Sequence, residues 1–159
     1  MKTTSLKLTP ITRAFAILAP VPEEHLLSGK QICDEQGKVA FGICAFEVFH
    51  RVKTSQYSGT INIFIYASIP QVPIGPMVSW QAVYDGYVEA RRNGSHPAGV
   101  RFRPPTAHQN DTPGWAIYWE VRDLRKIDPF PIQSLKGFDK KTHYVPHFVP
   151  EGPLVIECP

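Results

Sequence analysis

The sequence contains little cysteine and no long hydrophobic run, and both absences restrict the class of protein. Its 159 residues include three cysteines, none of them in a Cys-x-x-Cys pair. An odd number of widely spaced cysteines is typical of reduced thiols rather than of a disulfide framework. No apolar stretch approaches the roughly 20 residues that span a bilayer, and the N-terminus has no apolar core of the signal-peptide type. We therefore expect a cytoplasmic protein without a membrane partner.

The chain also lacks the short motifs of common enzyme families. It has neither a P-loop nor a dinucleotide-binding glycine fingerprint. Three candidate nucleophiles stand outside any Gly-x-Ser-x-Gly elbow, namely Ser28, Cys44 and Ser68. No cofactor is expected.

Histidines suggest two metal sites, and neither is favoured. His143 and His147 have the i, i+4 spacing of a helical metal pair, but Pro146 between them disfavours that helix. A second set combines His96, His108 and Asp111. Histidine in a surface or structural role is the default for both sets, so we expect no metal.

Proline, glycine and apolar residues are abundant. Sixteen prolines and eleven glycines, with 43% apolar residues, describe a chain cut by turns that still has material for a core. This composition favours short strands over long helices, and the length corresponds to about one domain. We expect a flexible N-terminus over residues 1–10 and a single α+β domain over residues 11–159.

Alternating apolar residues predict the strands. Strands are expected over residues 11–19, 59–68, 82–90, 114–121 and 154–156. In the second of these, Ile63 and Ile65 point to one face while Phe64 and Tyr66 point to the other, so both faces should be buried, as in a central strand. A helix over 79–92 is a competing interpretation of the third.

Helices are predicted at fewer places. Pro22 to Gly29 is typical of a short helix that stops at the glycine, followed by a loop over 29–37. Residues 39–52 satisfy neither period cleanly and favour a helix. Asp128 to Pro131 should break the chain before one helical turn over 132–136. Together the elements predict five or six strands, curled into a β-barrel, with two or three short helices.

The segment from Arg91 to Arg103 concentrates cationic groups between two predicted strands. It holds Arg91, Arg92, His96, Arg101 and Arg103. Guanidinium groups bind phosphate bidentately, and Gly94 and Gly99 would let backbone amides approach an anion. The alternative is a solvated connection whose arginines pair with nearby carboxylates, namely Asp85, Glu89 or Asp111.

Aromatic residues are numerous enough to build a base-stacking pocket. They include Trp80, Trp115 and Trp119 together with Tyr66, Tyr84, Tyr87 and Tyr118. A stacked base contributes about 1–3 kcal/mol, although most aromatic side chains in a β-rich domain belong to its core. Trp80 follows a proline-rich connection over 70–76, which would place it at a barrel mouth.

Several short motifs follow one another in a characteristic order. They are Ser28-Gly29-Lys30 after a short helix, Ile65-Tyr66-Ala67-Ser68 in a strand, Gly75, and Trp119-Glu120-Val121 followed by a Pro-Ile-x-x-Leu segment. This order resembles the PUA-like superfamily, in particular its ASCH and EVE branches, and implies a PUA-like β-barrel. The ASCH signature is Gly-x-Lys-x-x-Glu-x-Arg, whereas this chain has Gly29-Lys30 followed by Glu35 without the arginine.

The resemblance implies that the domain binds RNA or a modified nucleotide in a basic, aromatic-lined cleft. The expected binding residues are Lys30, Tyr66, Ser68, Trp80, His96, Arg101 and Arg103, with the arginines on phosphate and the two aromatics against the base. One alternative is a small ASCH-type hydrolase, a ribonuclease or nucleoside amidohydrolase, in which Lys30 and Glu35 are catalytic. Another is a protein-interaction module in which Trp80 and the proline loops bind a partner chain.

Overall fold

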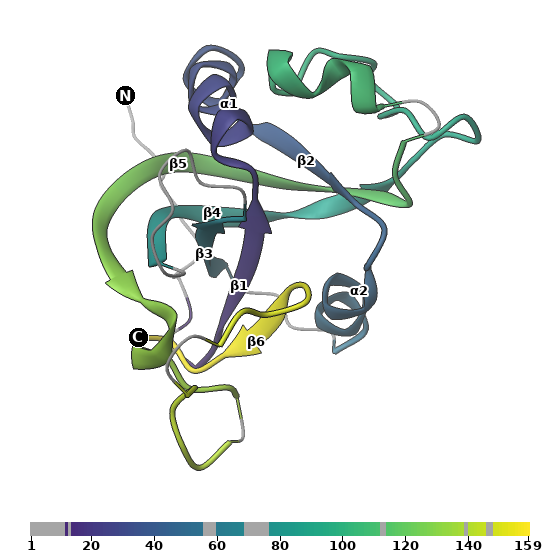
Figure 1. Cartoon of the computed structure of the whole chain (residues 1–159). Coiled ribbons are helices and arrows are strands. Elements are labelled where there is room, and N and C mark those ends of the chain that lie inside the picture. The colour runs from purple at the N-terminus through teal and green to yellow at the C-terminus, as the bar shows by residue number, and fades with distance from the viewer. Residues whose placement is uncertain are drawn as a thin grey trace, which may run out of the picture.

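A six-stranded sheet forms the centre of the molecule, with strand order β2-β5-β4-β3-β1-β6 (Figure 1). The computed structural model describes residues 12, 14–55, 60–68, 77–111, 114–138, 140–145 and 148–159. The strands are β1 (Ala16–Val21), β2 (Val39–Ile43), β3 (Ile61–Ala67), β4 (Met77–Glu89), β5 (Ile117–Pro131) and β6 (Leu154–Ile156). The helices are α1 (Glu23–Gln36), α2 (Glu47–Thr54) and two 3-10 helices, η1 (Pro105–Asn110) and η2 (Ile132–Ser134). The predicted α+β class is confirmed.

The sheet is curved but open. β1 and β3 run parallel, and the other neighbouring strands pair antiparallel. Three register shifts between β4 and β5 bend these long strands, and Figure 1 shows β5 sweeping around one side of the molecule. Among the described residues the edge strands β2 and β6 do not pair with each other, so the expected closed barrel is not confirmed.

The predicted central strand is confirmed as β3, which lies between β1 and β4. Its isoleucines Ile61, Ile63 and Ile65 belong to one buried cluster, and Phe64 and Tyr66 belong to another on the opposite face. Both α1 and α2 contribute residues to the first cluster, whereas the second is covered by the chain that follows β5. The alternation of isoleucine with aromatic residues in the sequence corresponds to these two faces, each of which packs against its own apolar layer.

α1 is longer than predicted and does not stop at Gly29. It continues to Gln36 and ends at Gly37, which has the left-handed φ of 87° that glycine adopts readily. Gly29 is instead a packing residue, because a Cβ there would lie 3.3 Å from the Pro104 side chain and 3.4 Å from the Phe41 ring. The predicted loop over 29–37 is therefore wrong.

Residues 39–52 hold two elements rather than the predicted helix. Val39–Ile43 forms β2, and α2 begins at Glu47, so the mixed periodicity records a strand followed by a helix. The predicted break at Asp128–Pro131 is also wrong, because β5 continues to Pro131 opposite Met77. Proline is tolerated at this strand end because its missing N–H removes no hydrogen bond from the middle of the sheet.

The remaining strand and turn predictions fare better. The 82–90 strand is confirmed within β4, so the competing helix over 79–92 is wrong, and 154–156 is confirmed as β6. The 11–19 prediction corresponds to β1, shifted to 16–21, and the predicted turn over 132–136 is the 3-10 helix η2. Residues 1–10 and 70–76, with Gly75, lie outside the described residues. No helix in the described part of the chain is long and apolar enough to cross a membrane.

An aromatic stack joins α2 to the sheet. The Phe49 ring stacks on Trp119 with 5.5 Å between ring centroids and an interplanar angle of 15°. Phe49 also lies 5.5 Å from the Tyr84 ring, and Phe41 lies 4.9 Å from Trp119 on β5. Phe49 is completely buried, so it fixes the position of α2 against β4 and β5.

Replacing Phe49 with alanine should reduce the free energy of unfolding by about 3–5 kcal/mol, because the truncation leaves a cavity inside the aromatic stack. Urea unfolding followed by tryptophan fluorescence measures the effect. The matched control is Arg51→Ala on the exposed side of the same helix, expected within about 0.5 kcal/mol of the wild-type protein. Equal losses in both variants would contradict the assigned role of the stack.

Candidate functional site

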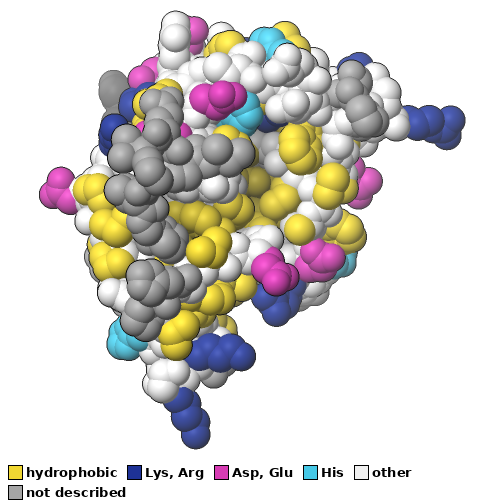
Figure 2. All heavy atoms as spheres, in the orientation of Figure 1, with side chains coloured by type: hydrophobic (Ala, Val, Ile, Leu, Met, Phe, Trp, Pro, Cys, Tyr) yellow, Lys and Arg dark blue, Asp and Glu magenta, His cyan; other side chains and the backbone are white. Residues whose placement is uncertain are grey.

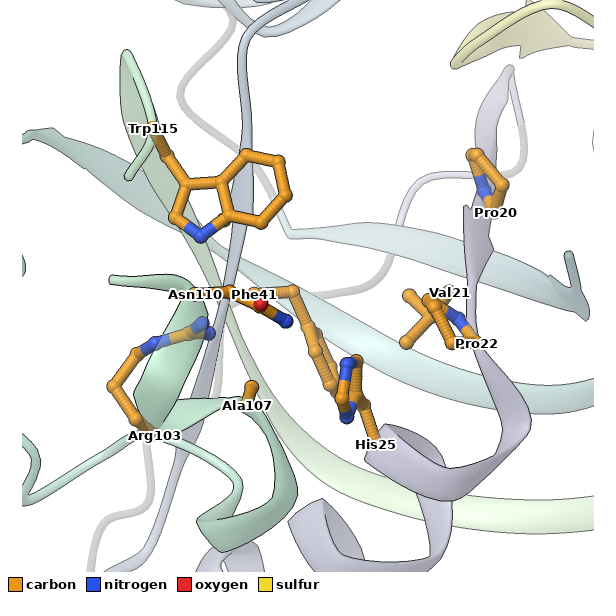
Figure 3. Close-up of a pocket in the computed structure, with 10 residues that line it drawn as sticks. Pro20, Val21, Pro22, His25, Phe41, Arg103, Ala107, Asn110 and Trp115 are labelled. Atoms are coloured by element: carbon orange, nitrogen blue, oxygen red, sulfur yellow. The ribbon is translucent and has the colours of Figure 1, made fainter. Parts of the chain in front are cut away.

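A cavity of about 110 Å³ opens where α1 follows β1, next to β2 and the loop between β4 and β5. Ten residues line it, and Figure 3 shows them converging from these separate elements (Figure 3). Most of the lining is apolar, and the polar atoms come from His25, Arg103, Asn110 and Trp115. Figure 2 shows hydrophobic side chains gathered in the middle of one face of the molecule, in the region between α1 and α2.

Two glycines position the Trp115 indole at this cavity. A Cβ on Gly42 of β2 would lie 2.2 Å from indole atom Cδ1, so the ring rests directly on the β2 backbone. Gly114 has a φ of 69°, and a Cβ there would lie 2.2 Å from the Asp111 carbonyl oxygen and 2.3 Å from that of Gly94. The chain can therefore turn into this position only through glycine.

The indole N–H of Trp115 is a buried donor that finds no acceptor in the described part of the chain. Among the described residues, Nε1 has no hydrogen-bond partner. In Figure 3 this nitrogen lies on the indole edge that faces Arg103, Phe41 and Asn110. Buried polar atoms are nearly always paired, and an unpaired one costs about 1–3 kcal/mol. An acceptor on a bound molecule would satisfy this donor.

Arg103 forms part of the cavity wall and is held there by Asp111. Its Nε lies 3.1 Å from both Asp111 carboxylate oxygens, and its Nη2 lies 2.7 Å from Oδ1. Nη1 donates to the Ala40 carbonyl oxygen at 2.7 Å, and the guanidinium lies 4.8 Å from the centre of the Tyr118 ring. The side chain is only 2% exposed, which a charge tolerates only with such partners.

The two arginines expected to hold phosphate together do not share one side. Arg103 fits the alternative prediction, in which an arginine of this segment pairs with a nearby carboxylate, here Asp111. It is buried because its neighbours on β2 and in the loop enclose it. Arg101 is exposed, donates to Gln36 Oε1 at 3.1 Å, and lies over the Phe102 ring. Of this pair, only Arg101 can reach a ligand in solvent.

His96 is likewise a structural residue. Its Nδ1 accepts the Ala98 backbone N–H at 2.9 Å, so the other nitrogen, Nε2, must carry the proton that is donated to Glu120 at 2.8 Å. Lys38 donates to the second Glu120 oxygen at 3.0 Å. Burial of Glu120 opposes ionisation, but the hydrogen bonds from His96 and Lys38 and the Lys38 charge outweigh it, so the pKa of this carboxyl is lowered.

A second histidine, His25, lies in the first turn of α1 and lines the cavity. Its Nδ1 lies 2.7 Å from Thr106 Oγ1 on η1, and Ser28 Oγ lies 2.8 Å from the same oxygen. The Thr106 hydroxyl also donates to the Glu24 carbonyl oxygen at 3.2 Å. These bonds join α1 to η1 along one edge of the cavity.

Tyr66 and Trp80 are core residues, which argues against the expected stacking role. Each is 3% exposed, because β3 and β4 are interior strands whose faces are covered. The Tyr66 hydroxyl donates to the Pro150 carbonyl oxygen, and burial raises the pKa of Tyr66 to about 12. A buried Trp80 also offers no patch to a partner chain.

Lys30, Glu35 and Ser68 are exposed or half-buried and do not line the cavity. Lys30 pairs with Asp34 one turn along α1 at 2.8 Å, and Glu35 accepts a hydrogen bond from Gln31. Ser68 follows β3, where its N–H donates to the Val21 carbonyl oxygen. The structure therefore does not bring the expected binding residues to one place.

Sequence reasoning did not assign His25, Phe41 or Asn110 to a site, and it named Trp115 only among the aromatic residues that could build a stacking pocket. The available signal was a pair of glycines: Gly42, on which the indole rests, and Gly114, which precedes Trp115 in the sequence. Neither glycine belongs to a known sequence motif. The described residues contain no group of three or more His, Cys, Asp and Glu side chains that could hold a metal ion. In the suggested set, His96 and Asp111 are engaged by Glu120 and Arg103.

Comparison with known proteins finds no matching family model, curated protein or solved structure. The resemblance to PUA-like domains therefore stays a hypothesis.

Replacing Arg103 with methionine should reduce the free energy of unfolding by about 3–5 kcal/mol, because Asp111 is left as a buried charge without its partner. Urea unfolding of R103M, D111L and the double variant R103M/D111L forms a double-mutant cycle. The double variant should lose much less than the sum of the two single losses. Additive losses would show that the ion pair is not coupled.

The lowered pKa of Glu120 predicts that this group stabilises the fold above the ordinary carboxyl pKa of 4.5 and loses that contribution as the pH falls through its folded value. The stability advantage of the wild-type protein over Glu120→Gln should therefore shrink on acidification from pH 7. Lys38→Met should show a smaller version of the same pH dependence, since one donor is gone. Urea unfolding across a pH series measures this, and a pH-independent difference between the wild-type protein and E120Q would refute it.

Proposed function

We propose that the protein binds RNA or a modified nucleotide, and that one base enters the cavity between α1, β2 and the loop that precedes β5. The observation that carries this proposal is the buried Trp115 N–H, which faces a mostly apolar cavity and lacks a partner among the described residues. A site of this type combines apolar and aromatic walls with a few fixed polar groups. Nucleobases offer a flat π-face and acceptors at the ring edge.

The size of the cavity supports a single small ring system. Its volume of about 110 Å³ is well below the range of about 300–1,000 Å³ that encloses drug-sized ligands. A base that leaves its stack can enter such a pocket while its sugar and phosphate remain outside. Phe41 and Trp115 supply the aromatic walls.

The charges of the loop support a ligand that is anionic at its phosphate and neutral at the base that enters the cavity. Arg103 is a fixed cation in the wall, so a positively charged base would be repelled there. Arg92 and Arg101 are exposed on the same loop and are the candidates for phosphate contacts. This arrangement retains the predicted role of Arg101 and gives Arg103 a structural one.

The hydrolase alternative has less support. Lys30 and Glu35 lie on α1 outside the cavity lining, and each already has a polar partner one turn away on the same helix. No pair of groups with opposed acid and base roles faces the cavity in the described residues. A binding function without catalysis therefore agrees better with the arrangement of residues around the cavity.

The phosphate role predicts that R92A/R101A binds single-stranded RNA more weakly, whatever its sequence. The slope of log affinity against log salt concentration should fall by about one for each lost contact. Fluorescence anisotropy with a labelled mixed-sequence oligonucleotide measures both quantities. K140A/K141A is the matched control, because it removes the same charge from exposed positions elsewhere and should leave both unchanged. Equal effects in the two variants would remove the loop from the interface.

The cavity role predicts that Trp115→Phe, which keeps an aromatic ring and removes the N–H, weakens RNA binding about three- to tenfold, as expected for one hydrogen bond. Gly42→Ala should weaken binding more, because its Cβ pushes the indole off β2. Circular dichroism and urea unfolding check that both variants fold. Wild-type affinity in both variants would overturn the proposed site.

A further inference from the structure

We propose that His25 selects the ligand by accepting a hydrogen bond from an N–H or amino group of the inserted base. This inference rests on the proposed function and adds a specificity-determining residue to the same cavity. It follows from the protons in the hydrogen-bond network between α1 and η1.

Thr106 has a single hydroxyl proton, and its use decides the state of the histidine. The Thr106 hydroxyl donates to the Glu24 carbonyl oxygen at 3.2 Å. All three contacts of the Thr106 hydroxyl are hydrogen bonds only if its oxygen accepts in the other two, which are 2.7 Å to His25 Nδ1 and 2.8 Å to Ser28 Oγ, because the Glu24 carbonyl oxygen can only accept. Nδ1 of His25 therefore carries a proton, and in the neutral ring Nε2 is left with a lone pair.

The environment of His25 favours that neutral ring. Burial lowers its pKa most, the Glu24 carboxylate on its own helix raises it, and the Arg103 guanidinium on the facing loop lowers it. Asp111, which pairs with Arg103, raises it by less. The net pKa is below the ordinary value, so His25 is an acceptor at neutral pH.

The free nitrogen is available to a ligand in the cavity. His25 lines the cavity, whereas Thr106, which holds Nδ1, does not. Within the described part of the chain no hydrogen bond involves His25 Nε2. Figure 3 shows His25 across the cavity from Trp115, with Phe41 and Asn110 between them.

Together the two groups define a polar pattern. Trp115 offers a donor and His25 offers an acceptor, so the matching base edge presents an acceptor and a donor. Cytosine and adenine have such edges, each with an amino group beside a ring acceptor. A base whose donor is missing would leave His25 Nε2 buried against it without a partner. The ligand class is therefore a neutral base with an unsubstituted N–H or amino group.

The first test needs no ligand. Nitrogen-15 NMR of the histidine ring should show His25 in the neutral form with the proton on Nδ1 at pH 7. Thr106→Ser keeps the hydroxyl and should preserve this signature, whereas Thr106→Val removes it and should shift the proton toward Nε2. A wild-type ring protonated on Nε2, or an unchanged signature in T106V, overturns the inference and leaves the proposed function standing.

The second test measures selectivity by calorimetry. The probes are cytidine and adenosine 5′-monophosphates, each paired with the analogue in which hydrogen replaces the amino group. For the tighter-binding pair, the wild-type protein and T106S should lose at least about tenfold in affinity with the analogue, because sites built around a polar contact reject ligands that lack it. In His25→Phe the affinities for the two members of the pair should differ by less than about threefold. The affinity ratio in T106V should lie between those of the wild-type protein and His25→Phe.

The outcomes separate the two proposals. Equal wild-type affinity for both members of a pair overturns the role of His25 while base binding stands. Binding of RNA without binding of any of the four common ribonucleoside 5′-monophosphates also overturns the role of His25. Failure of every mononucleotide and of RNA overturns the proposed function and this inference with it.

Discussion

The buried ion pair between Arg103 and Asp111 joins the loop between β4 and β5 to the strands β2 and β5. The guanidinium also donates to Ala40 on β2 and lies over Tyr118 on β5. A charge that is 2% exposed cannot lose any of these partners cheaply. Both residues belong to the loop between β4 and β5, and Arg103 also bonds to the backbone of β2. The ion pair therefore fixes this proline- and glycine-rich loop against the sheet.

The polar interactions of the loop explain how a cavity persists beside it. Tyr118 donates to Gly94, and Gly94 in turn accepts the Trp115 backbone N–H. His96 and Glu120 form a second buried pair beside them. Because Arg103, His96 and the Gly94 carbonyl oxygen are paired, the loop holds Trp115 in one orientation, and the proposed binding of a base would need little further ordering there. Among the described residues, the indole N–H is the buried side-chain polar group that this network leaves unpaired.

Strand patterns were the part of the fold that the sequence predicted well. β3 was recognisable because Ile63 and Phe64 face two separate apolar layers. β5 was recognisable because Trp119 lies in a run of alternating residues, Ile117 to Val121. Gly29 misled the helix prediction, since a glycine that stops a helix and one that packs a helix against Pro104 look the same in the sequence. Residues 39–52 were ambiguous because neither β2 nor α2 is long enough to establish its own period. Barrel closure requires the edge strands β2 and β6 to pair, and local sequence does not encode whether two distant strands meet.

The candidate site divides in a similar way. The sequence by itself determined that arginines and aromatics gather in and around residues 91–103, and that carboxylates lie near enough to compete for them. The tertiary structure alone decided that Arg103 is buried while Arg101 is exposed, and that Trp115 rather than Trp80 meets a cavity. The physical reason is that burial depends on which elements cover a side chain. One such element, β2, lies more than fifty residues away along the chain from the tryptophan that rests on it.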